Sequence, residues 1–144
     1  MVSSVVVADF PLFLDFLPPN PSALTVLHVN IRSIRKHWNE FQTIVGAVHV
    51  TVDVFVLTEI NVRDIDISQG QFSLPGFEAF FLTRSQSRGG GIAVYVKDGW
   101  STADIKVSFE HAECLSVKIF TNTSGISLMA FYRPPSGNVL KFLE

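Results

Sequence analysis

The stretch Val-Asp-Val-Phe-Val-Leu-Thr-Glu at 52–59 decides the fold, because its apolar residues run on almost without interruption and several of them are β-branched. Such a run is typical of a strand that is buried on both faces of a sheet. It ends in Glu59, a carboxylate that a buried strand would carry to the edge of its sheet. We therefore predict a central strand at 52–59.

An earlier strand and a helix precede this run. Residues 24–30 read Leu-Thr-Val-Leu-His-Val-Asn, which again has strand composition. Beyond Ser33, apolar residues recur at steps of three and four up to Val48, and this is helical spacing. Ser33 is a suitable N-cap, because a serine hydroxyl can accept a hydrogen bond from a backbone amide of the first turn. Strand, helix and strand at this length predict a βαβ unit with two parallel strands in one sheet.

The second half of the chain predicts short antiparallel strands joined by turns. The strand candidates are 77–82, 91–96, 113–120 and 126–132. Residues 61–73 read as a loop, and the glycines at 89–91 read as a hairpin turn and not as a phosphate cradle. A further helix is expected to begin near Val139. The predicted fold class is α/β.

Composition narrows the possible functions. The chain has 144 residues, of which 47% are hydrophobic and 17% charged, with a net charge of −2. This composition predicts one folded domain and excludes a polybasic nucleic-acid binder. A single Cys114 excludes an internal disulfide and a multi-cysteine zinc site. No run reaches the roughly 18 apolar residues that a membrane span needs.

The N-terminal segment 1–23 is expected to be a poorly ordered leader. It is apolar, but it lacks a basic start and carries Asp9, Asp15 and several prolines. This pattern does not match a secretory signal, so the protein is not expected to be secreted.

Three polar side chains are predicted to end strands: Asn30, Glu59 and Tyr132. Ligands of α/β sheets bind beyond the carboxyl ends of the strands. Mg²⁺ takes one or two carboxylates there and keeps several waters, while an amide and a phenol can hold phosphate oxygens. Taken singly, the three residues also fit a turn asparagine, a solvated strand end and a half-buried strand aromatic. Their shared location favours metal-assisted phosphoryl chemistry.

Five strings, in this order, carry a family resemblance: Leu-His-Val-Asn-Ile-Arg-Ser (27–33), Val-Asp-Val-Phe-Val-Leu-Thr-Glu (52–59), Leu-Pro-Gly-Phe (74–77), Arg-Gly-Gly-Gly-Ile-Ala-Val-Tyr-Val-Lys (88–97) and Phe-Tyr-Arg-Pro-Pro-Ser (131–136). The chain resembles the N-terminal half of the apurinic-type endonuclease domain of non-LTR (LINE-like) retrotransposons, in the exonuclease–endonuclease–phosphatase superfamily. The resemblance covers residues 24–144. It implies a four-layer α/β sandwich that is truncated here after its first half.

The resemblance also implies roles for residues. Asn30 matches the active-site asparagine of the first strand, Glu59 the metal-binding glutamate, and Tyr132 the tyrosine that hydrogen-bonds the scissile phosphate. The implied reaction is Mg²⁺-dependent hydrolysis of a DNA phosphodiester, and the resulting nick primes reverse transcription. Mg²⁺ is expected for the complete domain, and its binding to this chain is expected to be weak or absent. The implied partners are DNA and a downstream reverse transcriptase domain, and the implied location is the nucleus.

Two strings that the family carries later in its domain are missing. One resembles Gly-Asp-Phe-Asn and the other Ser-Asp-His, and neither occurs in these 144 residues. Since loss of an acid–base partner removes roughly 10²–10⁴ in rate, we expect the chain alone not to cleave DNA. Two alternatives stay open: a non-catalytic mobile-element remnant with at most weak nucleic-acid binding, and a fragment of another phosphoesterase of the superfamily.

Arginines near the predicted strand ends are candidates for nucleic-acid binding. Arg32 follows Asn30, Arg88 precedes the glycine turn, and Arg133 follows Tyr132. Contacts of this kind position a nucleic acid without specifying its sequence. Arg35 and Lys36, in contrast, are expected to lie on a solvated helix face.

Overall fold

The computed structural model describes residues 24–49, 51–84, 89–108, 112–120 and 124–135. The predicted leader at 1–23 and the helix predicted near Val139 lie outside the described residues.

The first sheet has four strands in the order β1-β2-β4-β3. They are β1 (Val26–Asn30), β2 (Val54–Thr58), β3 (Phe77–Leu82) and β4 (Ile92–Lys97). β1 and β2 are parallel, which confirms the predicted βαβ unit. β4 pairs antiparallel with both β2 and β3. All five residues of β2 are buried, as its unbroken apolar run predicts.

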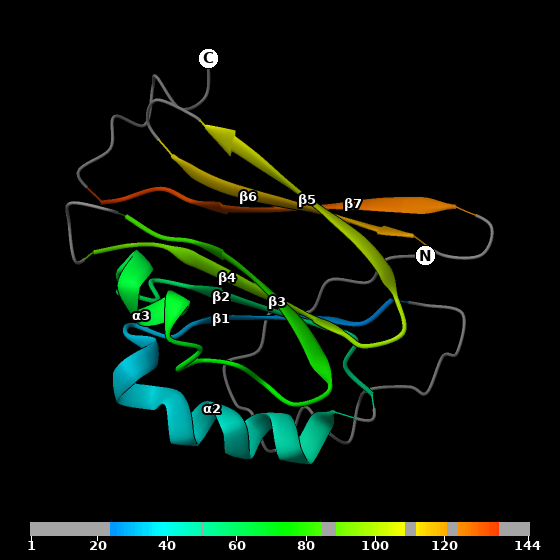
Figure 1. Ribbon diagram of the computed structural model, residues 1–144, viewed down its shortest axis with the longest axis horizontal. Helices are drawn as coiled ribbons and strands as arrows, with labels where there is room; N and C mark the ends of the chain where they lie inside the picture. The colour runs from blue at the N-terminus through cyan, green and yellow to red at the C-terminus, as the bar shows by residue number, and fades with distance from the viewer. Residues whose placement is uncertain (1–23, 50, 85–88, 109–111, 121–123, 136–144) are drawn as a thin grey trace.

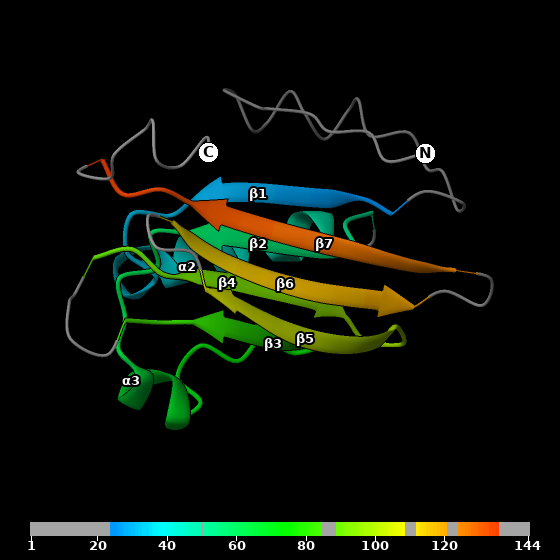
Figure 2. The same ribbon diagram turned by 90° about the horizontal axis from the view of Figure 1, so that it is seen from above.

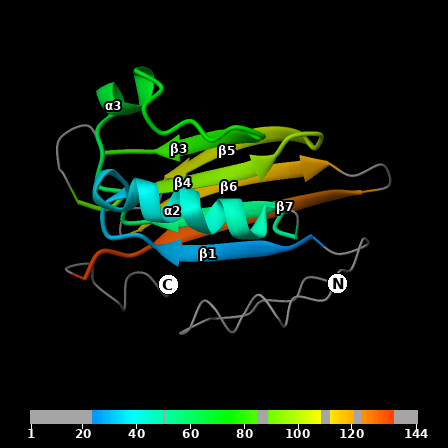
Figure 3. The ribbon, with the colours of Figure 1, turned by 90° about the horizontal axis from the view of Figure 1, so that it is seen from below.

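Helix α2 (Ile34–Val48) covers one face of this sheet (Figure 3). Its buried side chains recur at helical spacing and join the apolar cluster of the sheet; they are Ile34, Phe41, Val45 and Val48. Ser33 occupies the N-cap position, but its side chain makes no capping hydrogen bond, so that part of the prediction is wrong. The φ of 114° at Ser33 is unlike the extended backbone of an ordinary N-cap.

A second, short helix was not predicted. Residues 61–73 were expected to form a loop, and α3 (Asp64–Ser68) corrects that expectation. Five residues are too few to show a helical period. What stabilises the turn is local: the Asp66 carboxylate accepts a hydrogen bond from the backbone N–H of Arg63 at 3.1 Å.

The second sheet has three antiparallel strands in the order β5-β6-β7 (Figure 1). They are β5 (Ser101–Ser108), β6 (Glu113–Phe120) and β7 (Gly125–Tyr132). β5 was missed, because its sequence Ser-Thr-Ala-Asp-Ile-Lys-Val-Ser has few apolar residues and an aspartate, which is disfavoured in strands.

The two sheets pack face to face, with α2 on the far side of the first sheet (Figure 1). Residues of β2, β4, β6 and β7 share the apolar cluster between the sheets. β1 and β7 run in the same direction in the two different sheets, and their carboxyl ends point to the same edge of the sandwich (Figure 2). We call this the strand-end edge. None of the helices in the described residues has the length and apolar character needed to cross a bilayer.

Candidate active site at the strand-end edge

Backbone hydrogen bonds tie together the loops that follow β1 and β2. The N–H of Ile31 donates to the carbonyl of Thr58 at 3.0 Å, and the N–H of Ser33 donates to the carbonyl of Glu59 at 2.9 Å. The N–H of Asn61 donates to the carbonyl of Gly90 at 2.9 Å, which joins the segment before β4 to the same place. Three segments that are distant in sequence are therefore held at one edge.

Unusual backbone conformations gather in these two loops. Among the residues that the structure describes, four that are not glycine have a positive φ: Arg32 (50°), Ser33 (114°), Glu59 (56°) and Asn61 (54°). L-residues rarely adopt this region, and those that do concentrate at functional sites. The strained loops thus mark the same edge that the sequence predicted.

A hydrogen bond across the two sheets connects two of the predicted site residues. The phenol of Tyr132, at the end of β7, donates to Oε1 of Glu59 at 3.1 Å, although the residues are 73 positions apart. Burial raises the pKa of Tyr132, and the hydrogen bond and negative charge of Glu59 raise it further. Tyr132 is therefore a neutral donor at physiological pH.

Asn30 lies on the same edge, as predicted. It is exposed and pairs in register with Thr58, the residue before Glu59. Its Oδ1 accepts a hydrogen bond from the backbone N–H of Arg32 at 3.3 Å. The structure thus places the amide beside the Glu59 loop, with this hydrogen bond made inside its own turn.

Glu113 and Arg84 belong to this neighbourhood and were missed. Glu113 begins β6 and pairs in register with Tyr132. Its Oε2 accepts a hydrogen bond from the N–H of Gly91 at 2.7 Å, and its Oε1 is paired with Arg84. Only the register between β6 and β7 reveals this placement, and a single sequence does not show that register.

Gly91 is required by close packing at this edge. Its φ is +85°, and a Cβ built there would lie 2.8 Å from Cγ1 of Ile60 and 3.1 Å from the carbonyl oxygen of Leu82. The predicted hairpin turn therefore also presses against the loop that carries Glu59.

A cleft of about 650 Å³ opens beside the strand-end edge, between the start of α2 and α3. Its lining residues are Arg32, Ser33, Arg35, Lys36, Asn61, Arg63 and Asp66. Four cationic side chains against one carboxylate make this basic cleft suited to an anion. Arg35 and Lys36 are exposed, as predicted, but they line the cleft instead of an isolated helix face.

The structure describes two of the three arginines that were predicted to contact nucleic acid. Arg32 lines the basic cleft. Arg133 is half-buried beside Tyr132, and its guanidinium donates to the carbonyl of Pro134 at 3.4 Å. Arg88 lies outside the described residues.

The described residues can be compared with what a magnesium site requires. They contain no group of three or more His, Cys, Asp or Glu side chains that could hold a metal ion. Glu59 supplies one carboxylate, and Mg²⁺ binds proteins through one or two carboxylates while it keeps several waters. The chemistry of this donor suits Mg²⁺, but further ligands are needed for a complete site.

No family model matches the sequence, and no curated protein matches it by sequence. Solved structures do match. The AP endonuclease LMAP from Leishmania major aligns with a TM-score of 0.64 at 16% identity, over 83% of this chain and 43% of that one. The endonuclease domain of TRAS1, a telomere-specific non-LTR retrotransposon, aligns with a TM-score of 0.61 at 17% identity, over 83% of this chain and 50% of that one.

These likenesses define the class of fold. The chain has the endonuclease/exonuclease/phosphatase-like α/β fold, as the sequence resemblance predicted. More particularly, it has the fold of an AP endonuclease and of a retrotransposon endonuclease domain, and it spans about half of their length.

Proposed function

We propose that this chain is the N-terminal part of a Mg²⁺-dependent DNA endonuclease domain of the non-LTR retrotransposon type. The hydrogen bond between Tyr132 and Glu59 carries the proposal, since it joins a carboxylate and a neutral phenol from two sheets at one edge. That edge also carries strained loops and a basic cleft. The strings Arg-Gly-Gly-Gly (88–91) and Tyr-Arg-Pro-Pro-Ser (132–136) favour the retrotransposon type over other phosphoesterases of the superfamily.

Each residue at the edge has a role in the proposed site. Glu59 would bind Mg²⁺, which supplies positive charge that stabilises the phosphodiester transition state. Tyr132 has a single O–H donor, which it gives to Glu59 in the free chain. In the proposed complex it would turn that donor to the scissile phosphate. Asn30 would orient the same phosphate through its amide. Arg32 and Arg133 would contact neighbouring phosphates, and Arg88 is proposed for the same role on the sequence alone.

We further infer that the chain does not cleave DNA by itself. The strings expected to supply the remaining Asp, Asn and His groups are absent from its sequence. Residues that act as a unit lose almost all activity together. The complete domain would act on DNA in the nucleus and precede a reverse transcriptase domain.

The test separates binding from cleavage. Purified chain is titrated with a fluorescein-labelled DNA duplex, with and without Mg²⁺, and is incubated with supercoiled plasmid. We expect salt-dependent duplex binding that Mg²⁺ strengthens, and no nicking. Glu59→Ala should abolish the Mg²⁺ effect, whereas Glu40→Ala, an exposed acid on α2, should preserve it. Absence of duplex binding would contradict the proposal, and nicking abolished by Glu59→Ala would contradict the inactivity.

One observation favours a second candidate, a non-catalytic nucleic-acid-binding remnant. The described residues hold a basic cleft but no group of metal-binding side chains. This candidate predicts duplex binding that neither Mg²⁺ nor Glu59→Ala changes, so the same titration distinguishes the two.

A further inference from the structure

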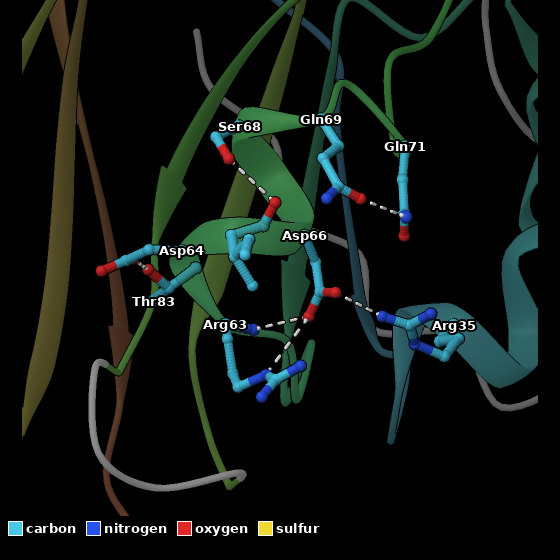
Figure 4. Close-up of polar contacts among 9 residues, drawn as sticks. Arg35, Arg63, Asp64, Asp66, Ser68, Gln69, Gln71 and Thr83 are labelled. Atoms are coloured by element: carbon cyan, nitrogen blue, oxygen red, sulfur yellow. Dashed lines mark hydrogen bonds and ion pairs between the residues drawn. The ribbon is translucent and has the colours of Figure 1, made fainter.

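Among the described residues that line the basic cleft, Asp66 is the only acidic side chain, and it lies between two arginines (Figure 4). Its Oδ1 is 2.6 Å from a terminal nitrogen of Arg35, on α2. Its Oδ2 is 3.9 Å from Nε of Arg63, just before α3. The same Oδ2 accepts the backbone N–H of Arg63. The Asp66 carboxylate therefore links α3 to α2, two helices that are not connected by sheet hydrogen bonds.

The exposures of the three side chains differ in a way that suggests their function. The Asp66 side chain is 11% exposed, whereas those of Arg35 and Arg63 are each 57% exposed. The carboxylate is thus enclosed, while both guanidinium groups keep much of their surface in solvent. A guanidinium has five N–H donors, and the contacts to Asp66 use only some of them.

A purely stabilising role does not account well for this arrangement. Ion pairs with largely exposed arginines contribute little to stability, because solvent screens them and ordering long side chains costs entropy. The cleft keeps an excess of three positive charges after Asp66 is counted. What the carboxylate does achieve is to restrict two flexible side chains to one place and orientation.

We propose that Asp66 is a positioning residue, which holds the guanidinium groups of Arg35 and Arg63 ready for a phosphate of the nucleic-acid backbone in the basic cleft. This inference rests on the proposed function. It assigns Arg35 and Arg63 as phosphate contacts beside the strand-end edge, and Asp66 as the residue that acts through them. The lowered pKa of Asp66, caused first by the Arg63 backbone N–H and then by Arg35, keeps the carboxylate charged in this role.

The test uses the sign of the change in DNA affinity. Asp66→Asn keeps the shape of the side chain and can keep the hydrogen bond to the backbone of Arg63, but it removes the charge that holds the arginines. If Asp66 does no more than repel the DNA phosphates, removing its negative charge should strengthen DNA binding. If it positions the arginines, we expect binding of a fluorescein-labelled duplex to weaken about tenfold, the loss of a charge-assisted hydrogen bond. The slope of log affinity against log KCl concentration should also become shallower by about one.

Asp64→Asn is the matched control, because it removes the same charge from the same helix. Asp64 is exposed and bonds with Thr83 instead of an arginine (Figure 4). We expect this variant to bind the duplex as tightly as the wild type or more tightly. Arg35→Lys, which keeps the charge but loses the planar fork, should weaken binding in the same direction as Asp66→Asn.

A second measurement does not depend on DNA. In ¹⁵N NMR spectra of the intact chain, the Nε–H signals of Arg35 and Arg63 should be dispersed in the wild type and move toward the positions of free arginine in Asp66→Asn. Thermal melts of Asp66→Asn, Asp64→Asn and Arg35→Lys check that each variant keeps the fold.

The outcomes are distinguishable. If the wild type does not bind the duplex, the proposed function fails and this inference falls with it. If the wild type binds and Asp66→Asn binds equally or more tightly, the positioning role alone is overturned. Unchanged arginine signals in Asp66→Asn would also overturn it.

Discussion

Tyr132 and Glu59 show at the scale of single residues how the sandwich sets the chemistry of a side chain. The phenol is half-buried and donates to a carboxylate that comes from the other sheet. Burial and the negative charge of Glu59 both disfavour phenolate and so raise the pKa of Tyr132. The charge of Glu113 raises this pKa further, whereas the positive charge of Arg84 lowers it. A group whose folded pKa is raised contributes stability below its unfolded pKa of about 10, and this stability is lost as the pH rises through the folded value.

We predict that Glu59→Gln lowers the pKa of Tyr132. The variant removes the negative charge but leaves the burial, so the pKa should fall toward 10 without reaching an ordinary value. Ultraviolet absorbance of phenolate during an alkaline titration measures this. Tyr95 serves as an internal control, because burial alone raises its pKa and its phenol donates to the carbonyl of Phe72. An identical titration curve for wild type and Glu59→Gln would show that the two groups do not interact.

Gly91 provides a second prediction at the residue scale. Gly91→Ala should destabilise the chain by about 3 kcal/mol, because the left-handed backbone and the overlap with Ile60 and Leu82 both add to the cost. Gly70→Ala is the control, since its φ is +70° and a Cβ there meets nothing within 4 Å. That variant should cost about 1 kcal/mol. Urea unfolding compares the two, and equal losses would mean that the contact behind Gly91 is not tight.

At the scale of elements, the helices and strands with a strong apolar pattern were predicted correctly. Those that depend on local contacts were missed. β2 has the β-branched apolar run of a buried strand and α2 has apolar residues at helical spacing, so both were predicted within a few residues. β5 and α3 have no such pattern, because β5 is largely polar and α3 depends on the Asp66 carboxylate. The candidate site divides in the same way. Asn30 and Tyr132 end recognisable strands and Glu59 directly follows one. Glu113, Arg63 and Asp66 are instead placed by register and by local or tertiary contacts.

Acid should therefore loosen the junction of α2 and α3. Asp66 has a lowered pKa, so it contributes stability above its unfolded pKa of about 3.9, and this contribution is lost as the pH falls through its lower folded value. We predict that the stability of the wild type declines more steeply below about pH 4 than that of Asp66→Asn. Urea midpoints measured between neutral and acidic pH give both slopes. Parallel curves would contradict the link between Asp66 and the arginines.

At the scale of the whole molecule, the second sheet has one face on the first sheet and one face turned away from it. Side chains of β7 alternate: Leu128, Ala130 and Tyr132 join the cluster between the sheets, while Met129 and Phe131 point the other way and are 46% and 44% exposed. The neighbouring structures are about twice as long as the stretch that aligns. An apolar face and open strand edges promote association.

This geometry predicts that the chain self-associates as its concentration rises. The double variant Met129→Lys with Phe131→Lys places two like charges on that outward face, so it should shift the population toward monomer with little loss of stability. Ile65→Lys is the matched control, because Ile65 is 55% exposed on α3, away from the second sheet, and should leave association unchanged. Light scattering coupled to size exclusion measures the mass at several loading concentrations. The prediction is contradicted if the wild-type chain stays monomeric at every loading concentration and melts in one sharp cooperative transition. The outward face of the second sheet would then be stable in contact with solvent.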